Sequence, residues 1–130
     1  MTARKLSDVP GLIDLLGRGV YTTMPPDVET LVSGGHAVVV ADPEAGAEAA
    51  LRLSACACCV TLITRSPRRG STALRRVRGL SRVRNIAVRL GIELVWAAGI
   101  EHLEAVVLRR TGSGRIDVCN AAALFLLSRE

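Results

Sequence analysis

The sequence predicts one α/β domain of three layers, with a central parallel sheet, helices on one side of it and a β-meander on the other. Short apolar runs alternate with helical patterns through the middle of the chain, as in parallel strands joined by right-handed crossovers. Towards the end of the chain the helical period gives way to strand-like segments, two of which flank a glycine-rich turn. That change of pattern predicts the meander.

The first strand and the helix after it carry the clearest signals. His36–Ala41 is a continuous apolar run, typical of a strand buried on both faces. Asp42, Pro43 and Glu44 then favour a helix start, with Asp as the N-cap, Pro at the first helical position and Glu in the first turn. We expect the helix to continue through the alanine-rich stretch, and Val60–Thr64 to form the next buried strand.

The remaining elements follow from weaker patterns. Thr72–Leu90 places apolar residues on one stripe and arginines on another, which predicts an amphipathic helix with Gly91 as its stop. We expect a third short strand at Ile92–Trp96. The turn of the meander is predicted at residues 111–114, and the last strands are expected at Leu103–Arg109, Arg115–Cys119 and Ala123–Leu127.

The first 35 residues differ from the rest of the chain. Glycines and prolines punctuate them, and short helical turns are expected near Ile13–Leu16 and Asp27–Val32. We therefore predict a lead-in segment at residues 1–35, packed on the surface of a domain at residues 36–130.

Composition excludes several classes of protein. The chain has 130 residues, of which 49% are hydrophobic, so it can bury a core and is not disordered. No apolar run approaches the roughly 20 residues that cross a bilayer, so we expect no membrane association. Arg4 and Lys5 are not followed by an apolar stretch, so we expect no signal peptide and a cytoplasmic location.

Arginine is concentrated in one part of the chain. The formal net charge is +5, and nine arginines with no acidic residue fall between Arg65 and Arg89. Such a segment can contact nucleic-acid phosphates in a salt-sensitive way, or it can be the solvated face of a helix. There is no recognised nucleic-acid motif and no aromatic residue among the arginines, so the sequence favours the solvated face and a nucleic-acid partner is not expected.

Five segments, taken in order, resemble a known domain. They are KLSDVPGLIDLLGRGVYTT, HAVVVADPEAGAEAALRL, VTLITRSPRR, LEAVVLRRTGSGRIDV and AALFLLS. Together they resemble the NADPH-binding domain of the thioredoxin reductase-like family, the pyridine nucleotide–disulfide oxidoreductases. The resemblance covers nearly the whole chain and implies a Rossmann-like fold.

The phosphate-binding loop departs from the family pattern. The family carries G-x-G-x-x-[GA] after the first strand, and the matching positions are residues 41–46. The second glycine, which lets backbone approach the pyrophosphate, is replaced by Pro43, which is bulkier and has no N–H. Asp42 and Glu44 add two negative charges where phosphates would lie. We therefore expect no family-like NADPH binding and predict no cofactor.

One ligand feature of the family is retained, and others are missing. The resemblance implies that Arg65, Arg68 and Arg69 occupy the turn that holds the 2′-phosphate of NADPH, so they are candidates for an anion site. A solvated turn is the alternative. The family's redox Cys-x-x-Cys falls near Tyr21–Pro26, where there is no cysteine. The chain begins in the linker and ends at the closing strand, so we expect no flavin domain.

These departures predict a non-catalytic module that binds a small molecule or a partner protein. A homo-oligomer or a separate flavoprotein subunit is expected to cover the face left apolar by the missing flavin domain. A second hypothesis is a cofactor-independent enzyme of the cyclase or isomerase type, with Asp42, Glu44 and His102 as its acid–base groups. Helix capping, and a solvent-exposed loop histidine, are the simpler explanations.

The cysteines complete the list of candidates. Cys56, Cys58 and Cys59 form a C-x-C-C cluster, and Cys119 lies on a predicted strand. A metal site needs three or four convergent ligands, and the two histidines are distant in sequence. Metal binding and redox sensing stay open for the cluster, but burial as small apolar residues is the commoner role. We predict no metal site and no catalytic residue.

Overall fold

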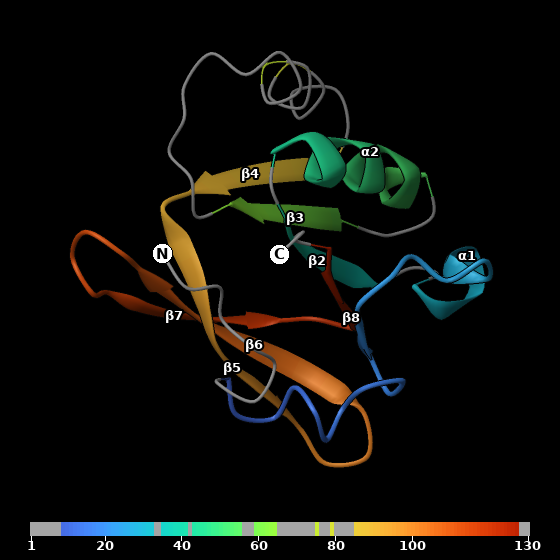
Figure 1. The fold of residues 1–130 in the computed structure, drawn as a ribbon, viewed down its shortest axis with the longest axis horizontal. Coiled ribbons are helices and arrows are strands. Elements are labelled where there is room, and N and C mark those ends of the chain that lie inside the picture. Colours follow the sequence, from blue (N-terminus) through green and yellow to red (C-terminus); the bar gives the residue numbers. More distant parts are fainter. Residues whose placement is uncertain are drawn as a thin grey trace.

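The central layer is a sheet of five parallel strands in the order β1-β8-β2-β3-β4 (Figure 1). The computed structural model describes residues 9–32, 35–41, 43–55, 59–64, 75, 79 and 85–127. The strands of this sheet are β1 (Val20–Tyr21), β2 (His36–Val40), β3 (Cys59–Thr64), β4 (Ile86–Leu90) and β8 (Ala123–Leu126).

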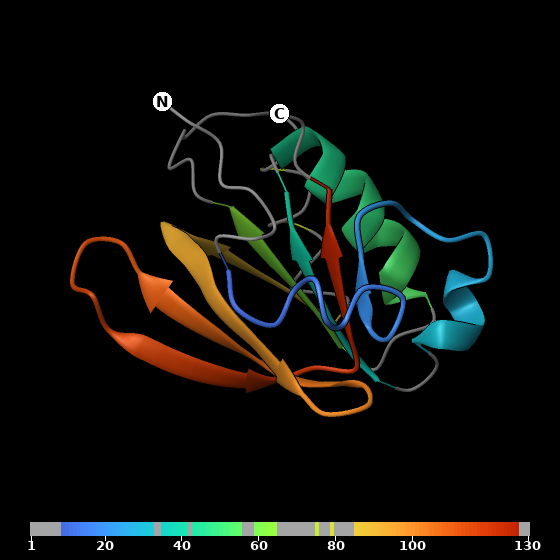
Figure 2. The same ribbon diagram turned by 60° about the horizontal axis from the view of Figure 1, so that its bottom comes forward.

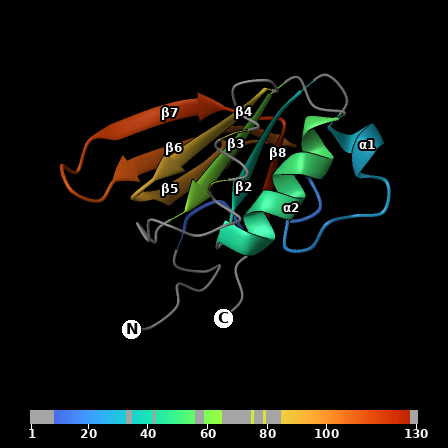
Figure 3. The ribbon, with the colours of Figure 1, turned by 90° about the horizontal axis from the view of Figure 1, so that it is seen from above.

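A helix covers one face of the parallel sheet and a second sheet covers the other (Figure 2). The helix is α2 (Pro43–Ser54), which packs on β2 and β3 and is seen in front of the sheet, beside β2, in Figure 3. The second sheet is the antiparallel meander of β5 (Ile92–Gly99), β6 (Leu103–Arg110) and β7 (Ile116–Asn120). The short α1 (Val28–Leu31) lies on the same side of the parallel sheet as α2. The three-layer prediction is confirmed.

Two hydrophobic cores, one on each face of the parallel sheet, hold these layers together. On the helix side, Leu53 of α2 packs against Val39 and Leu62 of the sheet. On the meander side, Val38 and its neighbours pack against strands β5 and β6, whose residues include Leu108. Both faces are buried because parallel strands sit between covering layers, which explains the continuous apolar runs in their sequences.

The segment before residue 36 contributes to both cores. Val20 pairs with Leu124 in the parallel sheet, and the ring of Tyr21 stacks on that of Phe125 with centroids 5.4 Å apart. Leu12 is also buried, on the meander side. The segment therefore supplies an edge strand and buried side chains to the fold.

The predicted helix at Thr72–Leu90 is wrong at its C-terminal end. Arg75 and Gly79 are helical, but Ile86–Leu90 forms β4, the fifth strand of the parallel sheet. Ile92–Gly99 then belongs to the meander rather than to the parallel sheet. The strand was missed because apolar residues at 83, 87 and 90 continue the helical spacing, while Ile86 and Val88 also fit a two-residue period.

The strand predicted at Ile92–Trp96 extends three residues further, to Gly99, and the other predicted strands and the start of α2 at Pro43 are confirmed within one or two residues. Gly91 is not the end of a helix. It has φ of +65° and makes the turn from β4 into β5. No helix within the described ranges is long and apolar enough to cross a membrane.

Candidate functional site

The carboxyl edge of the parallel sheet is the candidate site. We use this name for the edge at which β2, β3, β4 and β8 all end, and where α2 begins. In open α/β sheets ligands bind outside the carboxyl ends of the strands, where helix N-termini also point. The loop from β2 into α2 therefore lies where a bound nucleotide would be held.

This loop keeps one function of a phosphate-binding loop and loses another. Ala41 is buried and its N–H donates to the Ile63 carbonyl, so it extends the strand ladder. Gly46 lets α2 approach the sheet closely, since a Cβ there would lie 2.5 Å from Leu62 Cδ1. At the first residue of α2, however, Pro43 offers no N–H. The helix can therefore still pack closely against the sheet, but its first residue cannot donate a hydrogen bond to a pyrophosphate.

Several predicted site residues cannot be placed. Asp42 and the arginines of the predicted anion turn, Arg65, Arg68 and Arg69, lie outside the described residues. Glu44 is part of the first turn of α2, but its side chain is likewise not described. The prediction of an anion site on that turn therefore stays a prediction.

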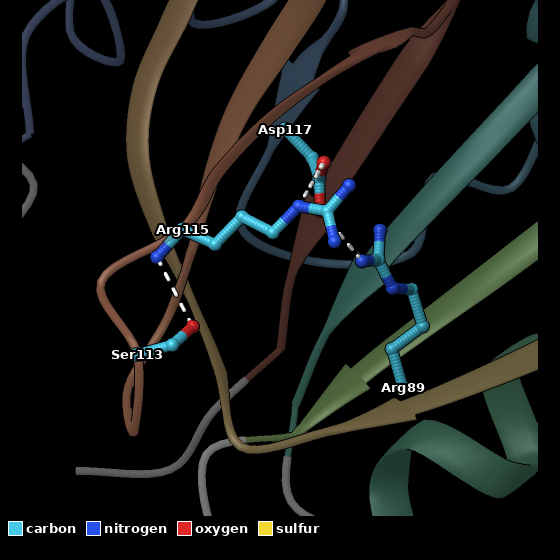
Figure 4. Close-up of polar contacts among 4 residues, drawn as sticks. All are labelled: Arg89, Ser113, Arg115 and Asp117. Atoms are coloured by element: carbon cyan, nitrogen blue, oxygen red, sulfur yellow. Dashed lines mark hydrogen bonds and ion pairs between the residues drawn. The ribbon is translucent and has the colours of Figure 1, made fainter.

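A second group of charges at the same edge was not predicted. Arg89 at the end of β4 donates from Nη2 to Asp117 Oδ2 of β7 over 3.0 Å. Arg115 Nε lies 4.0 Å from Asp117 Oδ1. Figure 4 shows the two guanidinium groups converging on the carboxylate from different layers. Mistaking β4 for a helix concealed this group, because only a strand at Ile86–Leu90 brings Arg89 to the meander.

The opposite end of the sheet, the amino edge, holds a different polar group. His36 Nδ1 lies 2.7 Å from the Asn120 carbonyl, and Nε2 lies 2.8 Å from Thr61 Oγ1. A carbonyl only accepts, so Nδ1 carries the hydrogen and Nε2 accepts from the Thr61 hydroxyl. Cys119 Sγ is 3.5 Å from Nδ1. The ring thus has a protein partner on each nitrogen.

Two thiols lie near this histidine. Cys59 is the register partner of His36. Burial raises the pKa of the Cys119 thiol, the positive charge of Arg89 opposes that rise, and Cys59 adds to it. Cys56 and Cys58 lie outside the described residues. Within the described ranges, no three His, Cys, Asp or Glu side chains are arranged to hold a metal ion.

The structure places His102 of the enzyme hypothesis far from the start of α2, where Glu44 lies. His102 is exposed in the turn between β5 and β6, and its Nδ1 lies 2.9 Å from the carbonyl oxygen of the neighbouring Leu103. The next residue, Leu103, packs against Gly19. The carbonyl of Gly19 accepts a hydrogen bond from the N–H of Leu124, which lies near the start of β8 and so at the amino edge. His102 therefore lies towards the amino edge, whereas residues 43 and 44 begin α2 at the carboxyl edge.

The outer face of the meander carries an exposed apolar row. Trp96, Val107 and Val118 are register partners across β5, β6 and β7. Trp96 and Val118 are 51% and 69% exposed, and neighbouring Ile116 is 51% exposed. Contiguous exposed apolar patches mark interaction surfaces in soluble proteins, so this row is a candidate for one.

Comparison with solved structures identifies the fold. Thioredoxin reductase from Lactococcus lactis superposes with a TM-score of 0.83 and 19% identity, covering 98% of this chain and 42% of that one. The thioredoxin reductase from Gloeobacter violaceus superposes with a TM-score of 0.78 and 25% identity, covering 98% of this chain and 39% of that one. The bacillithiol disulfide reductase from Staphylococcus aureus has a TM-score of 0.74 and 17% identity, and the match covers 97% of this chain and 36% of that one. No protein-family model matches the sequence, and neither does any curated protein.

This chain therefore has the fold of the NAD(P)-binding domain of thioredoxin reductase-like proteins, and the resemblance seen in the sequence is confirmed at the level of the fold. The chain spans about two fifths of the length of the thioredoxin reductases that it matches. The fold alone assigns no activity to it.

Proposed function

We propose that this chain is a non-catalytic binding module that holds a small anionic ligand at the carboxyl edge. The observation that carries the proposal is Pro43 at the first position of α2. A glycine at the matching position lets a pyrophosphate approach the backbone, and the first N–H groups of the helix bind it. Proline carries a ring that glycine lacks, and its nitrogen carries no hydrogen, so a pyrophosphate at this position has less room and one hydrogen-bond donor fewer.

Charge adds to the effect of the proline. Asp42 and Glu44 flank Pro43 in the sequence, and each carboxylate repels a phosphate placed at the start of the helix. NADPH, NADH and FAD all carry a pyrophosphate. We propose that none of them is the ligand, although the fold is that of a nucleotide-binding domain.

The segment that matches the family's redox cysteines supports the absence of disulfide chemistry there. Tyr21–Pro26 contains no cysteine. Tyr21 is instead stacked on Phe125, and Met24 packs against the core on the helix side. These side chains serve the fold, so the segment has no dithiol with which to exchange electrons.

The proposal is tested by calorimetric titration with NADPH, NADH, FAD, ADP-ribose and AMP. AMP presents a phosphate monoester without a pyrophosphate. We expect AMP to bind at least about tenfold more tightly than ADP-ribose, since a lost charge-assisted hydrogen bond costs about 1.5–3 kcal/mol. NADPH or NADH binding tighter than that of AMP would overturn the proposal.

A restored loop gives the complementary test. The double substitution Asp42→Gly with Pro43→Gly returns the donor and the space and removes one carboxylate. We expect it to gain ADP-ribose binding by about tenfold or more. Glu48→Gly is the matched control, because Glu48 is exposed on the same helix and its replacement also adds a glycine and removes a negative charge. Equal behaviour of the two variants would contradict the role of the loop.

We also propose a partner, because the exposed row Trp96–Val107–Val118 favours one. We propose a second copy of this chain that covers the row across a two-fold axis. Sedimentation equilibrium should then show a dimer that Val118→Glu dissociates, while Thr30→Glu, an exposed site on α1, leaves it intact. A monomer at all concentrations would contradict this, and binding to a separate flavoprotein subunit would then take its place.

A cytoplasmic location is part of the proposal. The four cysteines lack the regular spacing of a secreted disulfide scaffold, which suits a reducing compartment. Fractionation of the source cells should find the chain with cytoplasmic markers, and recovery from the envelope would contradict the location.

A further inference from the structure

Two arginines lie on the facing surfaces of the two sheets, and a third extends towards them from the hairpin of the meander. Arg89 is the register partner of Ile63, and Arg110 is the partner of Ile92. Both isoleucines are buried in the core between the sheets. Residues paired across neighbouring strands share a face, so both arginines lie on faces that turn towards the other sheet. Arg115 reaches the same space through Asp117, the partner of buried Leu108.

Charge in this space is not balanced. Arg89 and Arg115 converge on the Asp117 carboxylate at 3.0 and 4.0 Å, and Arg110 is exposed nearby at the end of β6. The next acidic side chain along the meander, Glu93, is bonded to Arg109 on the outer face. Within the described residues, two guanidinium groups therefore share the one carboxylate here and the exposed Arg110 adds a third positive charge, which leaves an excess of positive charge.

The backbone beneath these side chains is held in place. The N–H and hydroxyl of Thr111 both donate to the Gly91 carbonyl, at 2.9 and 3.0 Å, which ties the hairpin to the end of β4. Across the hairpin, the Arg110 N–H donates to the Arg115 carbonyl over 2.9 Å. A site on a fixed hairpin loses less entropy when it binds a ligand than one on a mobile loop does.

We propose that Arg89, Arg110 and Arg115 form a binding site for a phosphate monoester, in which the ligand displaces Asp117 from Arg115. Arg115 is 73% exposed and its 4.0 Å contact with Asp117 is loose, so that ion pair contributes little. A phosphate dianion offers the planar guanidinium a bidentate contact with more charge than a carboxylate has. Arg89 keeps the closer bond to Asp117 and holds the carboxylate aside.

The proposal deepens the proposed function and rests on it, because both place the ligand at the carboxyl edge. It names a phosphate monoester as the group that the ligand carries. A single compact cluster containing its own carboxylate suits one terminal phosphate better than a polymer of phosphodiesters, which is contacted by a spread row of cations. In the part of the meander that the structure describes, the neighbouring Arg109 does not extend the cluster, because it faces outward and is engaged by Glu93.

The test is calorimetric titration with inorganic phosphate and with AMP, at ionic strength held constant with NaCl. Arg110→Gln and Arg115→Gln should each weaken phosphate binding by about tenfold, the effect of a charge-assisted hydrogen bond. Arg109→Gln is the matched control: it removes the same charge from the same strand on the opposite face, and should change binding by less than about twofold. Circular dichroism checks that each variant is folded.

Asp117→Asn separates a binding site from a plain ion pair. Without the competing carboxylate, phosphate binding should strengthen by several fold, by the same charge argument. Glu104→Gln, on an exposed residue of β6, makes the same change of net charge and should leave binding unaltered. Equal effects of the two variants, or equal losses in Arg109→Gln and Arg110→Gln, would overturn the site. Tighter binding of a single-stranded oligonucleotide than of AMP would also overturn it.

The two proposals fail in different ways. If AMP binds the unaltered chain and all arginine variants equally, the binding module stands and the phosphate site is wrong. If inorganic phosphate binds as expected here but ADP-ribose binds as tightly as AMP, the account of Pro43 is wrong and the phosphate site stands.

Discussion

The two edges of the parallel sheet both carry polar side chains between the layers, but they use them differently. At the amino edge, the two ring nitrogens of His36 are bonded to Asn120 and Thr61. At the carboxyl edge, Asp117 is shared between Arg89 and Arg115, and the latter is 73% exposed. The first group joins β2, β3 and the end of β7 within the fold. The second leaves hydrogen-bond donors facing solvent.

This contrast shows why a histidine beside two thiols is not the best candidate for function here. The bonds that would make His36 a ligand or a base are already made to the protein. Within the described residues, no buried side-chain nitrogen or oxygen lacks a partner. Among the described residues, function is better sought at the carboxyl edge where Arg89, Arg110 and Arg115 lie near the single carboxylate of Asp117.

The largest expected effect in this comparison is on stability at the amino edge. His36→Ala removes the partner of the buried Thr61 hydroxyl and of the Asn120 carbonyl, and should lower the free energy of unfolding by about 2–4 kcal/mol. Urea denaturation measures this. His102→Ala is the control, since that ring is exposed, and should change stability by less than about 0.5 kcal/mol. Similar losses in the two variants would contradict a structural role for His36.

A smaller effect is expected at the carboxyl edge, where α2 approaches the sheet. Gly46→Ala places a Cβ 2.5 Å from Leu62 Cδ1, and Leu62 is buried. We expect a net loss of about 1 kcal/mol, because overpacking costs about 1–3 kcal/mol and the gain in helix propensity returns about 1 kcal/mol.

Gly79 is the matched control for this substitution. It is helical, exposed and has open space around its Cα. Gly79→Ala should therefore stabilise the chain by up to about 1 kcal/mol. The same sign of change at both glycines, measured by thermal unfolding, would be inconsistent with close packing at Gly46.

The smallest effect is a dependence of stability on pH. Burial raises the pKa of Cys119 in the folded chain, so the folded state keeps a proton that the unfolded state releases. The stabilisation is present below the pKa of the unfolded thiol and is lost as pH rises through the folded pKa. Urea unfolding between pH 7 and pH 10 should therefore show a decline above roughly pH 8.5 that Cys119→Ala reduces. An identical decline in both chains would show that this thiol does not contribute.

Local sequence was sufficient for most of the elements. The run His36–Val40 and the helix start at Pro43 were predicted correctly, because each depends on side chains within a few residues. The strand at Ile86–Leu90 was not, because its five residues fit two periodicities. Pairing with Val60–Thr64, far away in the chain, decides between them.

The candidate site likewise has one part that could be predicted from local sequence and one part that could not. Pro43 could be recognised as a break in the phosphate-binding pattern from its position after a strand. The approach of Arg89 to Asp117 and Arg115 could not be recognised, because Arg89 lies on β4 of the parallel sheet, whereas Asp117 lies on β7 of the meander and Arg115 in the hairpin before it.

By itself, the sequence determined the alternation of strands and helices, the altered loop at Pro43 and the excess of arginine. Only the tertiary structure decided which arginines contact a carboxylate and which histidine has both ring nitrogens hydrogen-bonded within the fold. The physical reason is the distance along the chain over which each effect acts. Backbone propensity, capping and periodicity act over a few residues, whereas charge pairing depends on distances that packing the meander against the parallel sheet creates.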